Sequence, residues 1–247
     1  MVAACGVASR LEDGPDAAAG VSLAKRMPNP LRQLLRPCSA ADFTAQLVAA
    51  GEVKTALDIG CGTRSHLSQF RPDIQTTGLD AHSEAIDLAK QRDVHDHYIQ
   101  ADILSDNLDA TFDLVTLYGL IEHLPKAKGF ELLDRVERLS AKFILLETPH
   151  GFVPQGPEFG NGYQRHHSGW FIHEFEGLGY KVHGTTGTRY LRGYMAGPRY
   201  GFPGCLLLDE ALTLVLRINR KPKHAFNLLA VKDVRGVPAR HKREAQP

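Results

Sequence analysis

The feature that most constrains this chain is a regular alternation of strand-like and helix-like segments between residues 54 and 150. Short apolar, β-branched runs such as KTALDIG and FDLVTLYG alternate with amphipathic stretches such as SEAIDLAKQ and GFELLDRVERLS. Strands that alternate with helices in this way predict a parallel sheet with helices on both faces. In such a sheet, ligands bind beyond the carboxyl ends of the strands, where the strand order reverses.

The segments outside this alternation give the domain organisation. Residues 1–38 are rich in Ala, Gly and Pro and predict a poorly ordered leader, residues 39–233 a single domain, and residues 234–247 a flexible basic tail. Two long insertions, 151–169 and 185–224, interrupt the domain, and loops of this length are usually functional or disordered. Both follow predicted strands near the carboxyl edge, so we expect them to form a substrate pocket and its lid.

Composition narrows the classes of protein. Lys and Arg total 29 and Asp and Glu total 28, so the formal net charge of +1 gives no reason to expect a nucleic-acid partner. No apolar run approaches the roughly 20 residues of a transmembrane helix. The cysteines have no CxxC spacing, which predicts reduced thiols in a cytoplasmic protein rather than a zinc site or disulfides. They are Cys5, Cys38, Cys61 and Cys205.

The strongest motif is LDIGCG, which lies where a predicted strand ends and a helix begins. Gly60 and Gly62 allow the backbone to turn tightly and to approach a ligand without a Cβ clash. In a dinucleotide-binding enzyme this position would hold a pyrophosphate. Here Asp58 precedes the glycines, and its carboxylate would repel phosphate and attract an ammonium group. The motif therefore favours a cationic, amino-acid-like ligand.

Two further acids end the next two predicted strands. Asp80 closes IQTTGLD and is placed to accept hydrogen bonds from both ribose hydroxyls of a nucleoside. Asp102 closes HYIQAD and can accept from an adenine amino group. The alternatives are a helix N-cap for Asp80, a role that Ser83 fills better, and a simple loop aspartate for Asp102. Three acids at successive strand ends predict a site for a nucleoside that carries a positive charge.

The series LDIGCG, GLD, QAD and FDLVTLYGLIEHLP resembles the class I S-adenosylmethionine-dependent methyltransferases, of the type 11/12 branch that includes ubiquinone-biosynthesis O-methyltransferases. The resemblance implies a Rossmann-like, seven-stranded, mostly parallel sheet whose last strand, in HAFNLLAVKD, is antiparallel. It also implies that S-adenosylmethionine is the cofactor and that eight residues surround it. These residues are Asp58, Gly60, Gly62, Asp80, Ala81, Asp102, Ile103 and Tyr118.

Two positions depart from the family pattern. Arg64 replaces the usual third glycine of the loop, so that it either crowds the loop or turns its side chain outward. The ubiquinone-type enzymes carry a glutamate near the position of Gly119 that, with a Glu-His pair, is linked to metal dependence. Only the pair Glu122 and His123 remains here, and we interpret it as a polar pair at a helix start. The sequence therefore predicts no metal.

The acceptor side is less defined. Methyl transfer depends mainly on in-line positioning, but a hydroxyl acceptor must also lose a proton, and histidine is the usual base near neutral pH. The candidates for the base are His150, directly after the fifth predicted strand, and His166, in the first insertion. Arginines mixed with tyrosines in the insertions suggest an anionic acceptor, or else a solvated loop surface. The candidate acceptor-binding residues are His123, Tyr163, Arg165, His167, Arg189 and Arg192.

Several functions remain open at this point. The first is a methyltransferase acting on a small-molecule, glycan or lipid-linked acceptor. We favour oxygen over nitrogen or carbon as the atom that is methylated. The second is an RNA or protein methyltransferase, although LYGL replaces the Asn-Pro-Pro-Tyr-type sequence after the fourth strand. The third is a non-catalytic cofactor-binding partner, and a nicotinamide-dependent dehydrogenase is a distant fourth. The helix CLLLDEALTLVLRI could cover an acceptor or form a dimer face, but core burial is its default.

Overall fold

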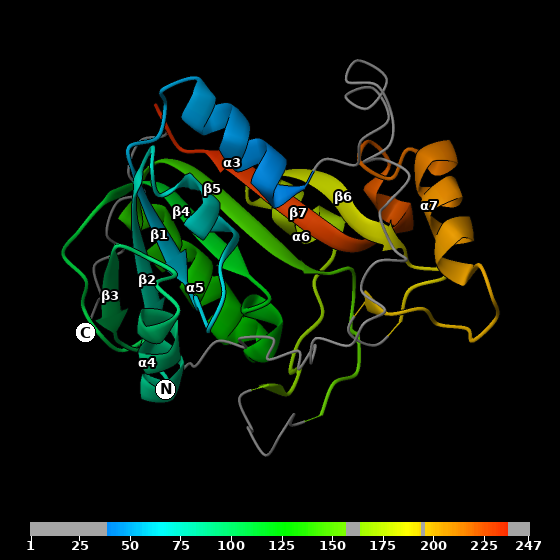
Figure 1. Ribbon diagram of the computed structural model, residues 1–247, viewed down its shortest axis with the longest axis horizontal. Coiled ribbons are helices and arrows are strands. Elements are labelled where there is room, and N and C mark those ends of the chain that lie inside the picture. Colours follow the sequence, from blue (N-terminus) through cyan, green and yellow to red (C-terminus); the bar gives the residue numbers. More distant parts are fainter. Residues whose placement is uncertain (1–38, 157–163, 194–195, 237–247) are drawn as a thin grey trace.

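The computed structural model describes residues 39–156, 164–193 and 196–236 (Figure 1). A seven-stranded sheet runs through the molecule in the order β3-β2-β1-β4-β5-β7-β6. The strands are β1 Thr55–Ile59, β2 Gln75–Asp80, β3 His97–Gln100, β4 Phe112–Tyr118, β5 Ser140–Pro149, β6 Lys181–Thr188 and β7 Ala225–Asp233. The strand-helix alternation of the sequence is confirmed as a Rossmann-like α/β fold.

The pairing of the strands fixes where a ligand can bind. Strands β1 to β5 pair in parallel, whereas β7 pairs antiparallel with both β5 and β6, as expected for the last strand. The order reverses between β1 and β4, since the chain runs outward from β1 to β3 and then returns to the other side of β1. The carboxyl ends of β1 and β4 therefore border the switch point, which is the ligand position of such sheets.

Helices cover both faces of the sheet (Figure 1). Helices α5 and α6 pack with Leu57 and Ile59 on one face, and α3 and the 3-10 helix η1 pack with Ala56 on the other. Helix α4 packs against β2 and β3, and α7 against β6. The helices are α3 Ala40–Ala49, η1 His66–Phe70, α4 Ser83–Gln91, η2 Ile121–His123, α5 Lys126–Leu139, α6 Ile172–Gly177, α7 Cys205–Leu216 and η5 Pro222–His224.

Helix α3 begins at a serine cap, whereas the start of α4 corrects an expectation. Ser39 caps α3, because its hydroxyl accepts from the Asp42 N–H while the Asp42 carboxylate accepts from the Ser39 N–H. Ser83 was expected to cap α4, but His82 occupies that position, and its side chain does not cap the helix. Asp80 closes this turn instead, since its Oδ1 accepts from the His82 N–H at 2.9 Å.

Helix α7 overturns the expectation of core burial. Its buried positions include Cys205, Asp209 and Thr213, whereas Leu207 is 62% exposed and Val215 is 77% exposed. The cause is Asp209, which is fully buried against Arg192 and therefore turns a polar face of the helix toward the domain.

No helix within the described ranges is long and apolar enough to cross a membrane. The expected leader, 1–38, lies outside those ranges, as does nearly all of the tail.

Candidate active site

The glycine turn after β1 and the acid that ends β2 form one hydrogen-bonded unit. Gly60 and Gly62 both adopt positive φ angles, of 74° and 55°, which favour glycine. The Gly62 N–H donates to Asp80 Oδ2 at 3.0 Å, and the Gly60 N–H donates to the Leu79 carbonyl oxygen at 2.7 Å. The turn is thus held open by backbone contacts with β2, and Asp80 is fixed at its edge.

Asp58 lies beneath this turn as a buried carboxylate. It accepts from the hydroxyls of Ser65 at 2.5 Å and Thr116 at 2.8 Å. Burial raises the pKa of Asp58 to about 6 despite these bonds. His95 Nε2 lies 3.7 Å from Asp58, but burial lowers the pKa of His95 to about 4, so this ring is neutral at pH 7. A cationic ligand would therefore relieve the buried charge of Asp58, which fits the ammonium group of the expected cofactor.

Asp102 and Ile103 follow β3 at the same edge. The Ala101 N–H donates to the Asp80 carbonyl oxygen at 3.1 Å, which ties the end of β3 to the end of β2. Asp102 is half-buried and accepts from the Leu104 N–H at 3.0 Å, whereas Ile103 is fully buried. The structure thus groups these residues with Asp80, as the sequence predicts, while their contacts with adenine remain predictions.

The structure decides how Arg64 lies relative to the glycine turn. Arg64 is exposed, so its side chain turns outward and does not crowd the glycine turn. The ring of Tyr118, at the end of β4, packs edge-on against His66 with 4.2 Å between ring centroids, on the face that α3 covers. Its hydroxyl is buried there without a hydrogen-bond partner in the described part of the chain. Ala81 is half-buried beside Asp80, and both cofactor roles stay predictions.

A second group of polar side chains gathers Glu122, His123 and His166 from two distant segments. Glu122 and His123 belong to η2, and His166 belongs to the first insertion. The ring centroids of His123 and His166 lie 4.7 Å apart in an edge-to-face arrangement, and all three residues are buried. The backbone N–H groups of His167 and Ser168 donate to the Glu122 carbonyl oxygen at 2.8 and 3.1 Å, which holds the insertion against η2.

Burial shifts the protonation of this group. The carboxylate of Glu122 accepts from the Thr148 hydroxyl at 2.9 Å, and burial raises its pKa to about 7. Burial also lowers the pKa of His123 to about 4 and lowers that of His166, so both rings are neutral at pH 7. Sequence reasoning treated Glu122 and His123 as a polar pair at a helix start and missed their meeting with His166. No sequence period links the two segments, so tertiary packing alone reveals the group.

His150 meets Arg189 where β5 and β6 end. Arg189 Nη1 lies 3.5 Å from His150 Nδ1, and the His150 N–H donates to the Phe226 carbonyl oxygen at 2.8 Å. Burial lowers the pKa of His150, and the charge of Arg189 lowers it further. The structure therefore brings one candidate base and one candidate acceptor-binding arginine together.

The other candidate acceptor residues are dispersed. Arg192 Nε donates to the buried carboxylate of Asp209 at 2.6 Å and so fixes α7 to the turn after β6. Arg165 and His167 are exposed, and Tyr163 lies outside the described residues. A role for any of these four in acceptor binding stays a prediction.

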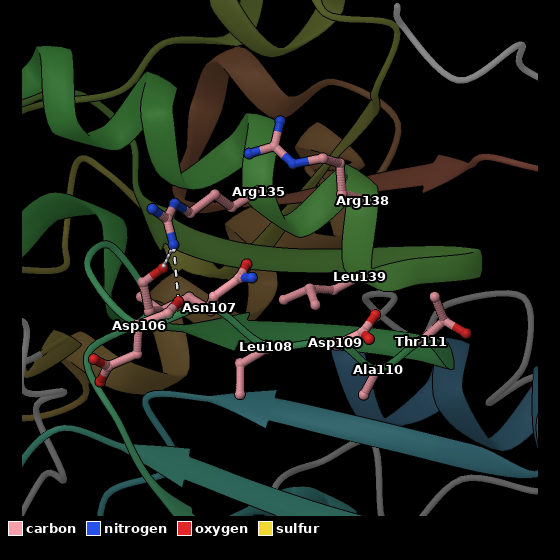
Figure 2. A pocket seen from close by; sticks show the side chains of 10 residues that line it. Asp106, Asn107, Leu108, Asp109, Ala110, Thr111, Arg135, Arg138 and Leu139 are labelled. Carbon is pink, nitrogen blue, oxygen red and sulfur yellow. Dashed lines mark hydrogen bonds between the residues drawn. The ribbon is translucent and has the colours of Figure 1, made fainter. Parts of the chain in front are cut away.

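A separate cavity of about 460 Å³ lies between the loop 104–111 and α5 (Figure 2). Arg135 reaches across it from α5 and donates to the carbonyl oxygens of Ile103 and Asp106, both at 3.0 Å. The lining residues do not include Asp58 or Asp80, so the cavity is distinct from the glycine turn. We assign it no ligand.

Residues 57–144, which run from within β1 to within β5, match a family model described as a methyltransferase domain. This segment is therefore similar to a methyltransferase domain. S-adenosylmethionine is the cofactor of such enzymes, and the glycine turn with its acids lies within the matched segment. The comparison with curated proteins gave no match.

Solved structures resemble this chain over different lengths. The plantazolicin methyltransferase BpumL is 20% identical, with a TM-score of 0.51, and the alignment covers 85% of this chain and 87% of BpumL. The magnesium protoporphyrin IX methyltransferase of Synechocystis PCC 6803 is 17% identical, with a TM-score of 0.46, and the alignment covers 69% of this chain and 80% of that one. An S-adenosylmethionine-dependent methyltransferase of Clostridium acetobutylicum is 17% identical, with a TM-score of 0.39. The alignment covers 44% of this chain and 49% of that one, so this chain spans about half of its length. The likeness to BpumL shows a shared fold.

Proposed function

We propose that this methyltransferase transfers a methyl group to a hydroxyl oxygen of a small-molecule, glycan or lipid-linked acceptor. The observation that best supports this is His150, a buried neutral imidazole at the carboxyl edge of the sheet, with Arg189 beside it. A nitrogen or carbon acceptor makes less use of such a base, whereas a hydroxyl must lose its proton as the oxygen–carbon bond forms.

The residues expected to bind the cofactor, on and directly after β1 to β3, would position it. Bound S-adenosylmethionine provides an electrophilic methyl group on its sulfonium. Asp58 would pair with the ammonium group of its amino-acid end. Asp80 accepts from the N–H groups of Gly62 and His82 and would accept from the ribose hydroxyls as well, since a carboxylate oxygen can accept more than one bond. Asp102 and Ile103 would contact the adenine.

The residues expected to bind the acceptor would also accept its proton. The pKa of His150 lies below its ordinary value, so the ring is neutral at pH 7 and able to accept a proton from the acceptor hydroxyl. Arg189 would then stabilise a nearby oxyanion, or an anionic group of the acceptor. His166 is the second candidate for the base, because its ring is also neutral.

The experiment separates acceptor classes by following the transferred group. The purified protein is incubated with S-adenosylmethionine carrying a labelled methyl group and with separate small-molecule, lipid, RNA and protein fractions of a cell extract. We expect label in the small-molecule or lipid fraction, in a product whose new methyl group mass spectrometry and NMR place on oxygen. Label in RNA or protein, or a methyl group on nitrogen, would instead support the alternative readings and contradict this proposal.

A further inference from the structure

The group formed by Glu122, His123 and His166 has the composition of a metal site. One potential ligand atom from each residue lies within 4.8 Å of the other two, and all three side chains are buried. The contacts that position them come from elsewhere in the chain. The Thr148 hydroxyl orients the Glu122 carboxylate, and the backbone bonds from His167 and Ser168 hold the insertion in place.

The hydrogen bonds of the two rings determine which nitrogen atoms are available. His123 Nδ1 lies 3.2 Å from the Arg165 carbonyl oxygen, and His166 Nδ1 lies 2.6 Å from the Val153 carbonyl oxygen. A carbonyl oxygen only accepts, so each Nδ1 carries the proton and each Nε2 presents a lone pair. Histidines that bind metals are held in this way, with the second ring nitrogen donating to a carbonyl or carboxylate.

We propose that Glu122, His123 and His166 bind a divalent first-row transition ion, and that an acceptor oxygen completes its coordination. Two imidazoles and one carboxylate suit Zn²⁺, Mn²⁺, Fe²⁺ or Co²⁺, whereas Mg²⁺ and Ca²⁺ prefer oxygen ligands throughout. The site differs from that of the ubiquinone-type enzymes, because Gly119 is where their additional glutamate lies and His166 comes from the insertion. Only the acceptor clause rests on the proposed function.

The position of the site connects it to methyl transfer. Gly119 directly follows β4, and a Cβ atom added there would lie 3.6 Å from Glu122 Oε1. The group is therefore next to the carboxyl end of a strand that borders the switch point. A bound ion would act as a Lewis acid on a coordinated hydroxyl and lower its pKa. His150 then remains the candidate base, and the acceptor would be one that offers a hydroxyl or carboxylate oxygen to the ion.

Cobalt binding tests the site without any acceptor. Tag-free full-length protein is dialysed against a chelator and titrated with Co²⁺ by calorimetry and visible absorption. We expect one ion per chain in the wild type, with the absorption of a nitrogen- and oxygen-ligated ion, and a higher unfolding temperature in its presence. Glu122→Gln and His166→Ala should each weaken binding more than about tenfold. His173→Ala, an exposed histidine on α6, should bind as the wild type does.

Each outcome decides the proposal. Absence of stoichiometric binding in the wild type, or equal binding by wild type, Glu122→Gln and His166→Ala, overturns it. Glu122→Gln preserves the side-chain shape and the contact with Thr148, and an unchanged unfolding temperature without metal would show that it folds. Affinity for S-adenosylmethionine is measured in the same samples. Protein that binds cobalt at this site but transfers no methyl group refutes the proposed function and leaves the metal site standing.

Discussion

We call residues 55–118, which are proposed to bind the cofactor, the cofactor half, and residues 150–224, which are proposed to bind the acceptor, the acceptor half. The two halves are held together by different means. In the first, backbone N–H groups and short side chains at strand ends fix the carboxylates, as Gly62 does for Asp80. In the second, contacts between side chains distant in sequence fix the groups, as Arg189 does for His150 and Arg192 does for Asp209. We therefore expect substitutions in the first half to affect cofactor binding and those in the second to affect turnover and stability.

The largest expected effect tests this division at His150. Removing the imidazole in His150→Ala should lower kcat by about 100-fold or more, because a positioned base contributes roughly that factor. The affinity for S-adenosylmethionine should stay nearly unchanged, since the residues proposed to bind it lie on or directly after β1 to β4. Steady-state kinetics and calorimetry measure the two quantities. His97→Ala, an exposed histidine on β3, serves as the control. Full turnover in His150→Ala would transfer the role of base to another group.

The second prediction concerns the stability of the acceptor half. Asp209 accepts from the Thr188 N–H at 2.8 Å and from its hydroxyl at 2.7 Å, besides its pairing with Arg192. Asp209→Ala leaves these donors unpaired and should lower the free energy of unfolding by about 3 kcal/mol. Urea denaturation measures the change. Glu210→Ala, next to it on α7, should cost less than about 0.5 kcal/mol. Equal losses in the two variants would show that the ion pair does not anchor α7.

The third prediction isolates the cofactor half. Asp80→Ala removes the acceptor for the Gly62 and His82 N–H groups together with the expected ribose contact. We expect the affinity for S-adenosylhomocysteine, measured by calorimetry, to fall about 100-fold, because charged hydrogen bonds contribute roughly 1.5–3 kcal/mol each. Asp87→Ala, on the exposed side of α4, should retain the wild-type affinity. Wild-type affinity in Asp80→Ala would remove the ribose assignment.

Sequence reasoning was most successful where the structure depends on local patterns. The strand-helix alternation and the antiparallel last strand are both confirmed. The acids that end β1, β2 and β3 meet at one edge because parallel strands bring their carboxyl ends together, so their order in the chain was sufficient to group them. Ser83 shows the limit, since His82 takes the cap position without a side-chain cap bond and Asp80 closes the turn instead.

The acceptor half was less predictable because its contacts are not local. The pairing of His166 with Glu122 and His123 spans two segments without a shared period, and the sequence offered only a polar pair in its place. Helix α7 was expected in the core, but an apolar composition does not show that Asp209 would be the residue turned inward. Positions that depend on tertiary packing of long insertions thus required the structure.

The smallest expected effect is the pH dependence of the affinity for S-adenosylmethionine, which should distinguish the two halves of the molecule. Asp58 attracts the cofactor ammonium only when it is ionised, and burial raises its pKa to about 6. Affinity for S-adenosylmethionine should therefore be constant near pH 7 and fall below pH 6, approaching about tenfold per pH unit, as expected for competition with one proton. Calorimetry from pH 5 to 7 measures this. His95, the basic neighbour of Asp58, has its pKa lowered to about 4 and does not titrate in that range. Asp58→Asn should bind weakly with no such slope, whereas His150→Ala should keep the slope in full, because that residue belongs to the other half. A slope that survives in Asp58→Asn would assign the titration to a different group and remove the ammonium contact from Asp58.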